Sequence, residues 1–149
     1  MKMNESDAQK CYETLCRTLE KNDIRYKCDS KSLCVRCSIS GRDIEQHYAF
    51  SIDPSKMLIT LYCEVPVRIS REAICDIAFA LCMINNAIPD GSFCIDLNEA
   101  ILYFKMTVSF FSSAVSDQIY LYMLSAAADT IDRYYPGLSR ISAQAYRTA

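Results

Sequence analysis

Three stretches of the chain repeat apolar residues every three or four positions, the spacing that collects them on one face of a helix. This pattern predicts helices over residues 8–19, 70–88 and 116–135. Pro136–Gly137 should end the last helix, because Pro lacks the amide proton and Gly favours a helix terminus. We therefore expect a loose C-terminal tail over about residues 138–149.

Between these helices apolar and polar residues alternate, as expected for strands with one buried and one exposed face. Turns rich in Asp, Ser, Asn and Pro separate the alternating segments. The strands are predicted over residues 33–39, 44–52, 57–65, 93–97 and 101–110, with a further short strand at 24–28. The last two long strands should form a hairpin around Asn98–Glu99.

The predicted elements follow the order α-β-β-β-α-β-β-α, with the short strand at 24–28 as an addition to the first group. Strands and helices do not alternate as in βαβ units, so the sheet should be antiparallel. We predict an α+β fold with three helices and an antiparallel sheet of five or six strands. No linker or repeat divides the 149 residues, and we expect a single domain over 1–149.

Composition and charge narrow the range of functions. Hydrophobic residues make up 51% of the chain, enough to form a core, and the formal net charge is only -2. We predict no nucleic-acid partner, because such binding depends on many Lys and Arg contacts to phosphate. No run of 18 apolar residues occurs, so no membrane span is predicted. The polar start, Met1–Asp7, lacks the apolar core of a secretory signal, and a cytoplasmic location is expected.

Nine cysteines could indicate metal or redox chemistry, and Cys34 and Cys37 have the spacing of a C-x-x-C motif. This motif lies in a predicted strand, where residues three apart point to opposite faces. No second C-x-x-C follows, and His47 is the only histidine. We therefore favour a structural role for the cysteines over a zinc or redox site, and predict no metal and no cofactor.

Motifs of known catalytic sites are absent from the sequence. No G-x-S-x-G occurs, and His47 falls on a strand face that should meet solvent. Three glycines in the whole chain do not form a phosphate-binding loop. We predict a non-enzymatic protein with no catalytic residues. The alternative is a small enzyme or small-ligand binder whose pocket carries no recognisable motif.

Two segments carry a set of motifs in a definite order. In the first, a strand at residues 58–67 precedes a helix that ends at Asn85 and a strand that reads Gly91-Ser92-Phe93-Cys94-Ile95-Asp96. In the second, the strand at 101–105 precedes a long helix that ends Ile131-Asp132-Arg133-Tyr134-Tyr135-Pro136.

With these motifs, residues 5–137 resemble the YbjN family of bacterial domains, which are labelled sensory transduction regulators. The resemblance implies a fold like that of type III secretion chaperones, commonly dimeric. It also implies binding to another protein or peptide, as a chaperone, adaptor or regulator. The family offers no catalytic residues to carry over.

One face of the sheet should pack against the helices, which leaves Leu58, Tyr62, Ile101 and Tyr103 on the opposite face. These side chains are more apolar than a solvent face requires, so we predict them as a candidate partner-binding face. The alternative is that helices cover both faces of the sheet.

The helix over 70–88 has more apolar residues than one buried stripe requires, including Phe79 and Met83. We predict a homodimer with Phe79 and Met83 as its candidate surface, since two-fold dimers dominate soluble oligomers. The alternative is that the final helix, or the tail over 138–149, covers these two side chains within one chain.

Overall fold

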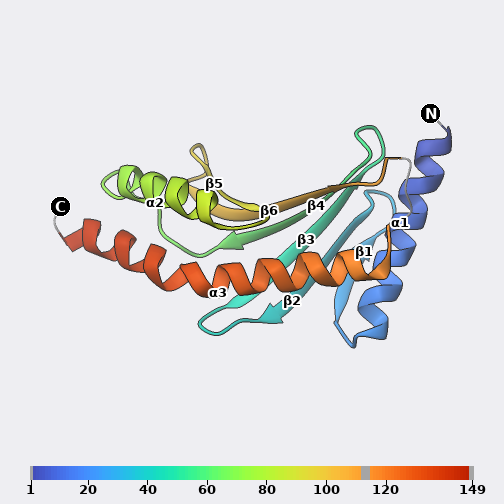
Figure 1. The fold of residues 1–149 in the computed structure, drawn as a ribbon, viewed down its shortest axis with the longest axis horizontal. Helices are drawn as coiled ribbons and strands as arrows, with labels where there is room; N and C mark the ends of the chain where they lie inside the picture. The colour runs from blue at the N-terminus through green and yellow to red at the C-terminus, as the bar shows by residue number, and fades with distance from the viewer. Residues whose placement is uncertain (1, 112–114, 148–149) are drawn as a thin grey trace.

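Within the residues that the structure describes, 2–111 and 115–147, three helices lie on one face of a six-stranded antiparallel sheet (Figure 1). In this computed structural model the elements are α1 (Lys2–Lys21), β1 (Tyr26–Asp29), β2 (Cys34–Ser40), β3 (Glu45–Asp53), β4 (Leu58–Val65), α2 (Ile74–Ala87), β5 (Ser92–Asp96), β6 (Ile101–Ser109) and α3 (Asp117–Arg147). The strands lie in the order β1-β2-β3-β4-β6-β5. The predicted fold class is confirmed. The short strand predicted at 24–28 corresponds to β1, so four strands precede α2.

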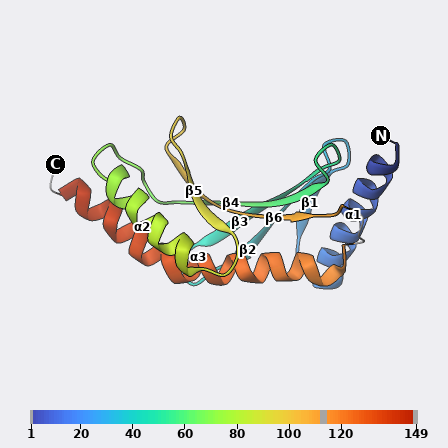
Figure 2. The same ribbon diagram turned by 45° about the horizontal axis from the view of Figure 1, so that its top comes forward.

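The core lies between the sheet and the helices (Figure 2). Every second residue of β3 and of β4 is buried, because successive side chains of a strand point to opposite faces. The buried strand side chains meet one apolar stripe on each helix. These helical residues are Ala8, Leu15 and Leu19 of α1, Ile77 and Leu81 of α2, and Tyr120, Met123, Ala127 and Ile131 of α3. No described helix covers the other face of the sheet (Figure 2).

The helix α3 continues through Pro136–Gly137, so the predicted loose tail over about 138–149 is wrong. The described part of that segment is helical, and its last two residues lie outside the described chain. A proline inside a helix costs about 3 kcal/mol, through a lost hydrogen bond and a steric clash. Packing offsets this cost, because Leu138 is buried and Ser142 Oγ donates a hydrogen bond to Arg68 O at 2.6 Å.

The β1–β2, β3–β4 and β5–β6 hairpins share one turn design. An Asp ends the first strand, and its carboxylate accepts hydrogen bonds from backbone amides two or three residues further on, at 2.9 to 3.2 Å. Four residues after the Asp, the chain takes a positive φ of 50 to 54° before the next strand. The Asp residues are Asp29, Asp53 and Asp96, and the residues with positive φ are Leu33, Met57 and Ala100. These carboxylates therefore stabilise the turns in which they lie.

The side chain of Asn85, in the last turn of α2, forms hydrogen bonds with the edge of β5 that is not paired with another strand. Its amide group donates a hydrogen bond to Phe93 O at 2.9 Å, and its oxygen accepts one from Phe93 N at 2.8 Å. The ring of Phe93 packs edge-on against Phe104 and Tyr134, at centroid distances of 5.0 and 6.3 Å. Three residues of the family-like motifs, Asn85, Phe93 and Tyr134, therefore hold α2, β5 and α3 together.

A polar network joins the turn between β2 and β3 to α3. Asp132 Oδ1 accepts hydrogen bonds from Gln46 Nε2 at 2.8 Å and from the backbone amide of Arg42 at 3.0 Å. The buried hydroxyl of Tyr48 donates to Gln46 Oε1, and Gln46 is itself buried. A Cβ on Gly41 would lie 2.6 Å from Asp132 Oδ1, so only glycine leaves room for this contact.

Candidate protein-binding surface

The outer face of the sheet, defined by the strand residues that point away from the helices, carries a pair of tyrosines, of which Tyr62 is exposed and Tyr103 is half-buried. Tyr62 of β4 and Tyr103 of β6 stack with ring centroids 4.4 Å apart and an interplanar angle of 19°. Tyr62 is 38% exposed. Partial burial, followed by the neighbouring Tyr103 hydroxyl, raises the pKa of Tyr62 to about 12. Tyr62 therefore stays neutral at physiological pH and offers an aromatic platform.

All four residues of the predicted partner-binding face lie on the outer face, but they do not form one patch. Tyr62 and Tyr103 are in contact. Leu58 pairs with Ser109 at one end of the β4–β6 ladder, whereas Ile101 lies beyond the other end and pairs with Asp96 of β5. The alternative, in which helices cover both faces, is wrong for the described residues, because all three helices lie on the inner side (Figure 2).

One row of outer-face residues crosses the whole sheet. Directly opposed residues connect, from β1 to β5, Lys27, Arg36, Ala49, Tyr62, Lys105 and Ser92. A hollow of about 670 Å³ lies over the first four strands, and Lys27, Arg36, Ala49 and Tyr62 are among the residues that line it. The predicted partner-binding face did not include the basic members of this row. The alternation along the strands puts Lys105 on the same face as Tyr103, and it could also have placed Arg36 there.

His47 also lies on the outer face and is exposed, as predicted. Its Nδ1 lies 2.7 Å from Ser38 Oγ, directly across the β2–β3 ladder. A serine and a histidine in contact are two parts of a hydrolytic site. Both residues lie within the ladder of β2 and β3, where they are directly opposed. We interpret the pair as a cross-strand hydrogen bond.

Three of the cysteines, Cys11, Cys37 and Cys63, are buried in the core, whereas Cys28, Cys75 and Cys82 are exposed. Cys34 lies on the outer face and Cys37 is buried on the inner face, which confirms that the two point in opposite directions. Burial raises the pKa of the Cys37 thiol to about 11 and that of Cys63 to about 12, so both are neutral and poorly nucleophilic. All nine cysteines are free thiols. Among the described residues no group of three His, Cys, Asp or Glu side chains could hold a metal.

The predicted dimer surface lies on the side of α2 that faces away from the sheet. Phe79 is 71% exposed and Met83 is 62% exposed, whereas Ile77 and Leu81 of the same helix are buried. The C-terminal part of α3 runs beside α2 (Figure 1). It borders a shallow hollow with Phe79 and Ala80, yet leaves the Phe79 ring open to solvent. Within one chain, α3 therefore covers only part of the side of α2 that faces away from the sheet.

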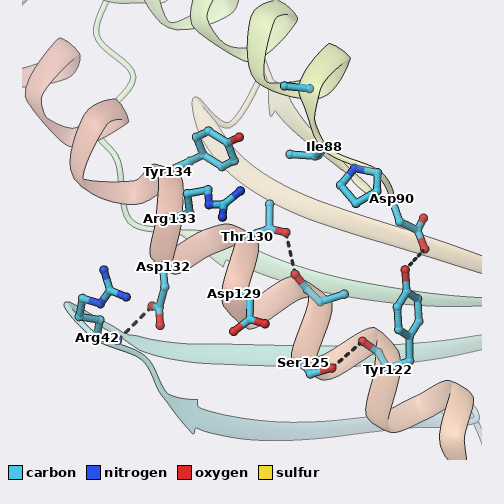
Figure 3. A pocket seen from close by; sticks show the side chains of 13 residues that line it. Arg42, Ile88, Asp90, Tyr122, Ser125, Asp129, Thr130, Asp132, Arg133 and Tyr134 are labelled. Carbon is cyan, nitrogen blue, oxygen red and sulfur yellow. Dashed lines mark hydrogen bonds between the residues drawn. The ribbon is translucent and has the colours of Figure 1, made fainter.

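A second hollow, of about 650 Å³, lies between α3 and the loop that follows α2 (Figure 3). Two of its polar groups bond to each other, since the Tyr122 hydroxyl donates to Asp90 Oδ2 at 3.1 Å. Asp132 faces the network with Arg42 and Gln46. Most polar side chains that line this hollow are thus hydrogen-bonded to other residues of the same chain.

Across residues 2–111 and 115–147, none of the helices is both long enough and apolar enough to span a lipid bilayer. The face with the stacked tyrosines and the exposed side of α2 are the two candidate binding surfaces.

Comparison with known proteins identifies the fold. No protein-family model and no curated protein matches the chain. YbjN from E. coli, a candidate transcription regulator, matches in structure with a TM-score of 0.61 and 11% identity, over 92% of each chain. A chain of the HopA1–SchA chaperone–effector complex matches with a TM-score of 0.56 and 12% identity, over 89% of this chain and 95% of that chain. The fold implied by the family resemblance is confirmed: this chain has the fold of YbjN and of the matching chain in the HopA1–SchA complex.

Proposed function

We propose that this chain is a non-enzymatic protein-binding domain, a chaperone or adaptor, that receives a partner on the outer face of its sheet. One observation carries the proposal: a whole sheet face without a helical cover bears the stacked rings of Tyr62 and Tyr103. Exposed aromatic rings are favoured at protein interfaces, because they bury a large area at little cost in side-chain entropy.

The shared fold supports the same role. One of the two similar structures is a complex of a chaperone with its effector, and the other protein is described as a candidate regulator. Neither description names a reaction. The sequence contains no catalytic motif, which agrees with a binding role. A cytoplasmic location remains a prediction.

Site-specific photo-crosslinking in the native cell tests the outer face. A photoreactive benzoylphenylalanine in place of Tyr62 should give one discrete adduct, since a bound partner would lie against the ring. The same amino acid in place of Glu13, exposed on α1, is the matched control and should give no adduct of that mass. Adducts at Glu13 together with none at Tyr62 would contradict the proposed surface.

We further propose that the chain forms a homodimer through the exposed side of α2, around Phe79 and Met83. Sedimentation velocity over a range of concentrations should show a dimer for the wild type and a folded monomer for Phe79→Glu, because a buried charge without a partner opposes association. Gln118→Glu adds the same charge at an exposed site of α3 and should remain dimeric. A wild-type protein that stays monomeric at the highest concentration would rule out the dimer.

A further inference from the structure

Basic side chains flank the stacked tyrosines along the row that crosses the outer face. Lys27 of β1 and Arg36 of β2 are directly opposed, and Lys105 of β6 is directly opposed to Tyr62. Ala49 and Tyr62 separate the two basic ends. None of the three basic side chains forms a hydrogen bond or an ion pair within the described chain.

The pairing of Lys27 with Arg36 is unfavourable for the isolated protein. Like charges directly opposed on neighbouring antiparallel strands destabilise the sheet. Neither side chain has a carboxylate within ion-pair distance among the described residues. An anion placed between them would convert this repulsion into two attractions.

The acidic residues of the outer face lie in other rows of the ladder. Glu45 is opposed to Ser40, and Glu64 is opposed to Tyr103, although both glutamates line the same hollow as Lys27 and Arg36. The remaining carboxylates accept backbone hydrogen bonds in the hairpin turns and belong to Asp29, Asp53 and Asp96. From Lys27 to Lys105 the row is therefore basic at both ends, with Ala49 and Tyr62 between them.

We propose that this row binds an extended acidic segment of the partner protein, with carboxylates at both basic ends and an apolar side chain over Ala49 and Tyr62. The row from β1 to β6 covers four strand spacings of about 4.8 Å, or about 19 Å in all. About six residues of extended chain span that distance. This inference rests on the proposed binding role of the outer face and adds the chemistry of the partner.

A synthetic peptide of seven residues, with two glutamates at each end and a central leucine, serves as the probe. In an NMR titration it should shift the amide signals of Lys27, Arg36 and Lys105, and its affinity should fall severalfold with added salt, because salt screens exposed charges. A copy with lysines in place of the glutamates should cause no such shifts. Equal binding of the lysine peptide, or shifts confined to the helices, would overturn the proposal.

The variant Lys27→Glu gives a second test that does not depend on a loss of folding. It replaces a like-charge pair with an opposite-charge pair, so its melting temperature should equal or exceed that of the parent. Its affinity for the acidic peptide should fall roughly tenfold, since an attraction becomes a repulsion. Arg17→Glu makes the same charge change on α1 and should leave the affinity unchanged. An equal loss in both variants would mean a general charge effect and would overturn the site.

The two proposals can fail separately. If the acidic peptide does not bind while crosslinking at Tyr62 still yields a discrete partner adduct, the acidic segment is wrong and the binding face stands. If neither gives a signal, the binding face is wrong as well.

Discussion

Ile77→Asp should unfold the domain. Ile77 lies fully buried in α2, against the inner face of the sheet. A carboxylate there would lose its hydration without gaining a partner, at a cost of several kcal/mol. The total stability of a domain is about 5–15 kcal/mol, so the variant should lose its cooperative transition in urea and its native circular dichroism.

The neighbouring position supplies the control for that experiment. Ala78 is exposed on the same helix, and Ala78→Asp should remain folded, with a loss of about 0.5–1 kcal/mol from lower helix propensity. If Ile77→Asp melted like Ala78→Asp, the side of α2 that faces the sheet would be assigned wrongly.

Asp132→Ala should destabilise the protein by about 2–3 kcal/mol, measured by urea unfolding. The substitution removes the acceptor of Gln46 Nε2 and of the Arg42 amide, and an unpaired polar group in a buried position carries its full desolvation cost. Gln46 cannot turn toward water, because its side chain is buried and also accepts the Tyr48 hydroxyl.

Asp129→Ala is the matched control for the network. Asp129 lies three residues earlier on α3, is exposed, and makes no hydrogen bond or ion pair within the described chain. Its removal should change the stability by less than about 0.5 kcal/mol. Equal effects of the two substitutions would show that the hydrogen bonds from Gln46 and Arg42 add nothing to stability.

The strands could be predicted from the sequence because each has one buried and one exposed face. The predicted 44–52 and 57–65 lie within one residue of β3 and β4 at each end. The same alternation placed Tyr62 and Tyr103 on the outer face. It could not bring the two rings together, because α2 and β5 separate β4 from β6 in the sequence, so no hairpin turn fixes the register of these two strands.

The helices were predicted less accurately, because tertiary packing decides which of their residues are buried. The helical spacing of Ile77, Ala78, Leu81 and Cys82 predicts one buried stripe on α2. Ala78 and Cys82 are exposed, however, since α2 packs along a narrow line through Ile77 and Leu81. At the other end of the chain, Pro136 is a strong local stop signal. The contacts of the residues that follow it outweigh that signal.

The hydrogen bonds between Asn85 and Phe93 limit how copies of this protein can aggregate. An open sheet edge can recruit strands from further molecules and so seed fibres without a fixed size. At β5 a recruited strand would first have to displace the Asn85 amide from both backbone groups of Phe93. Growth by addition of strands is therefore opposed at this edge. In the proposed homodimer both copies use the same side of α2, and such a two-fold contact closes at two subunits.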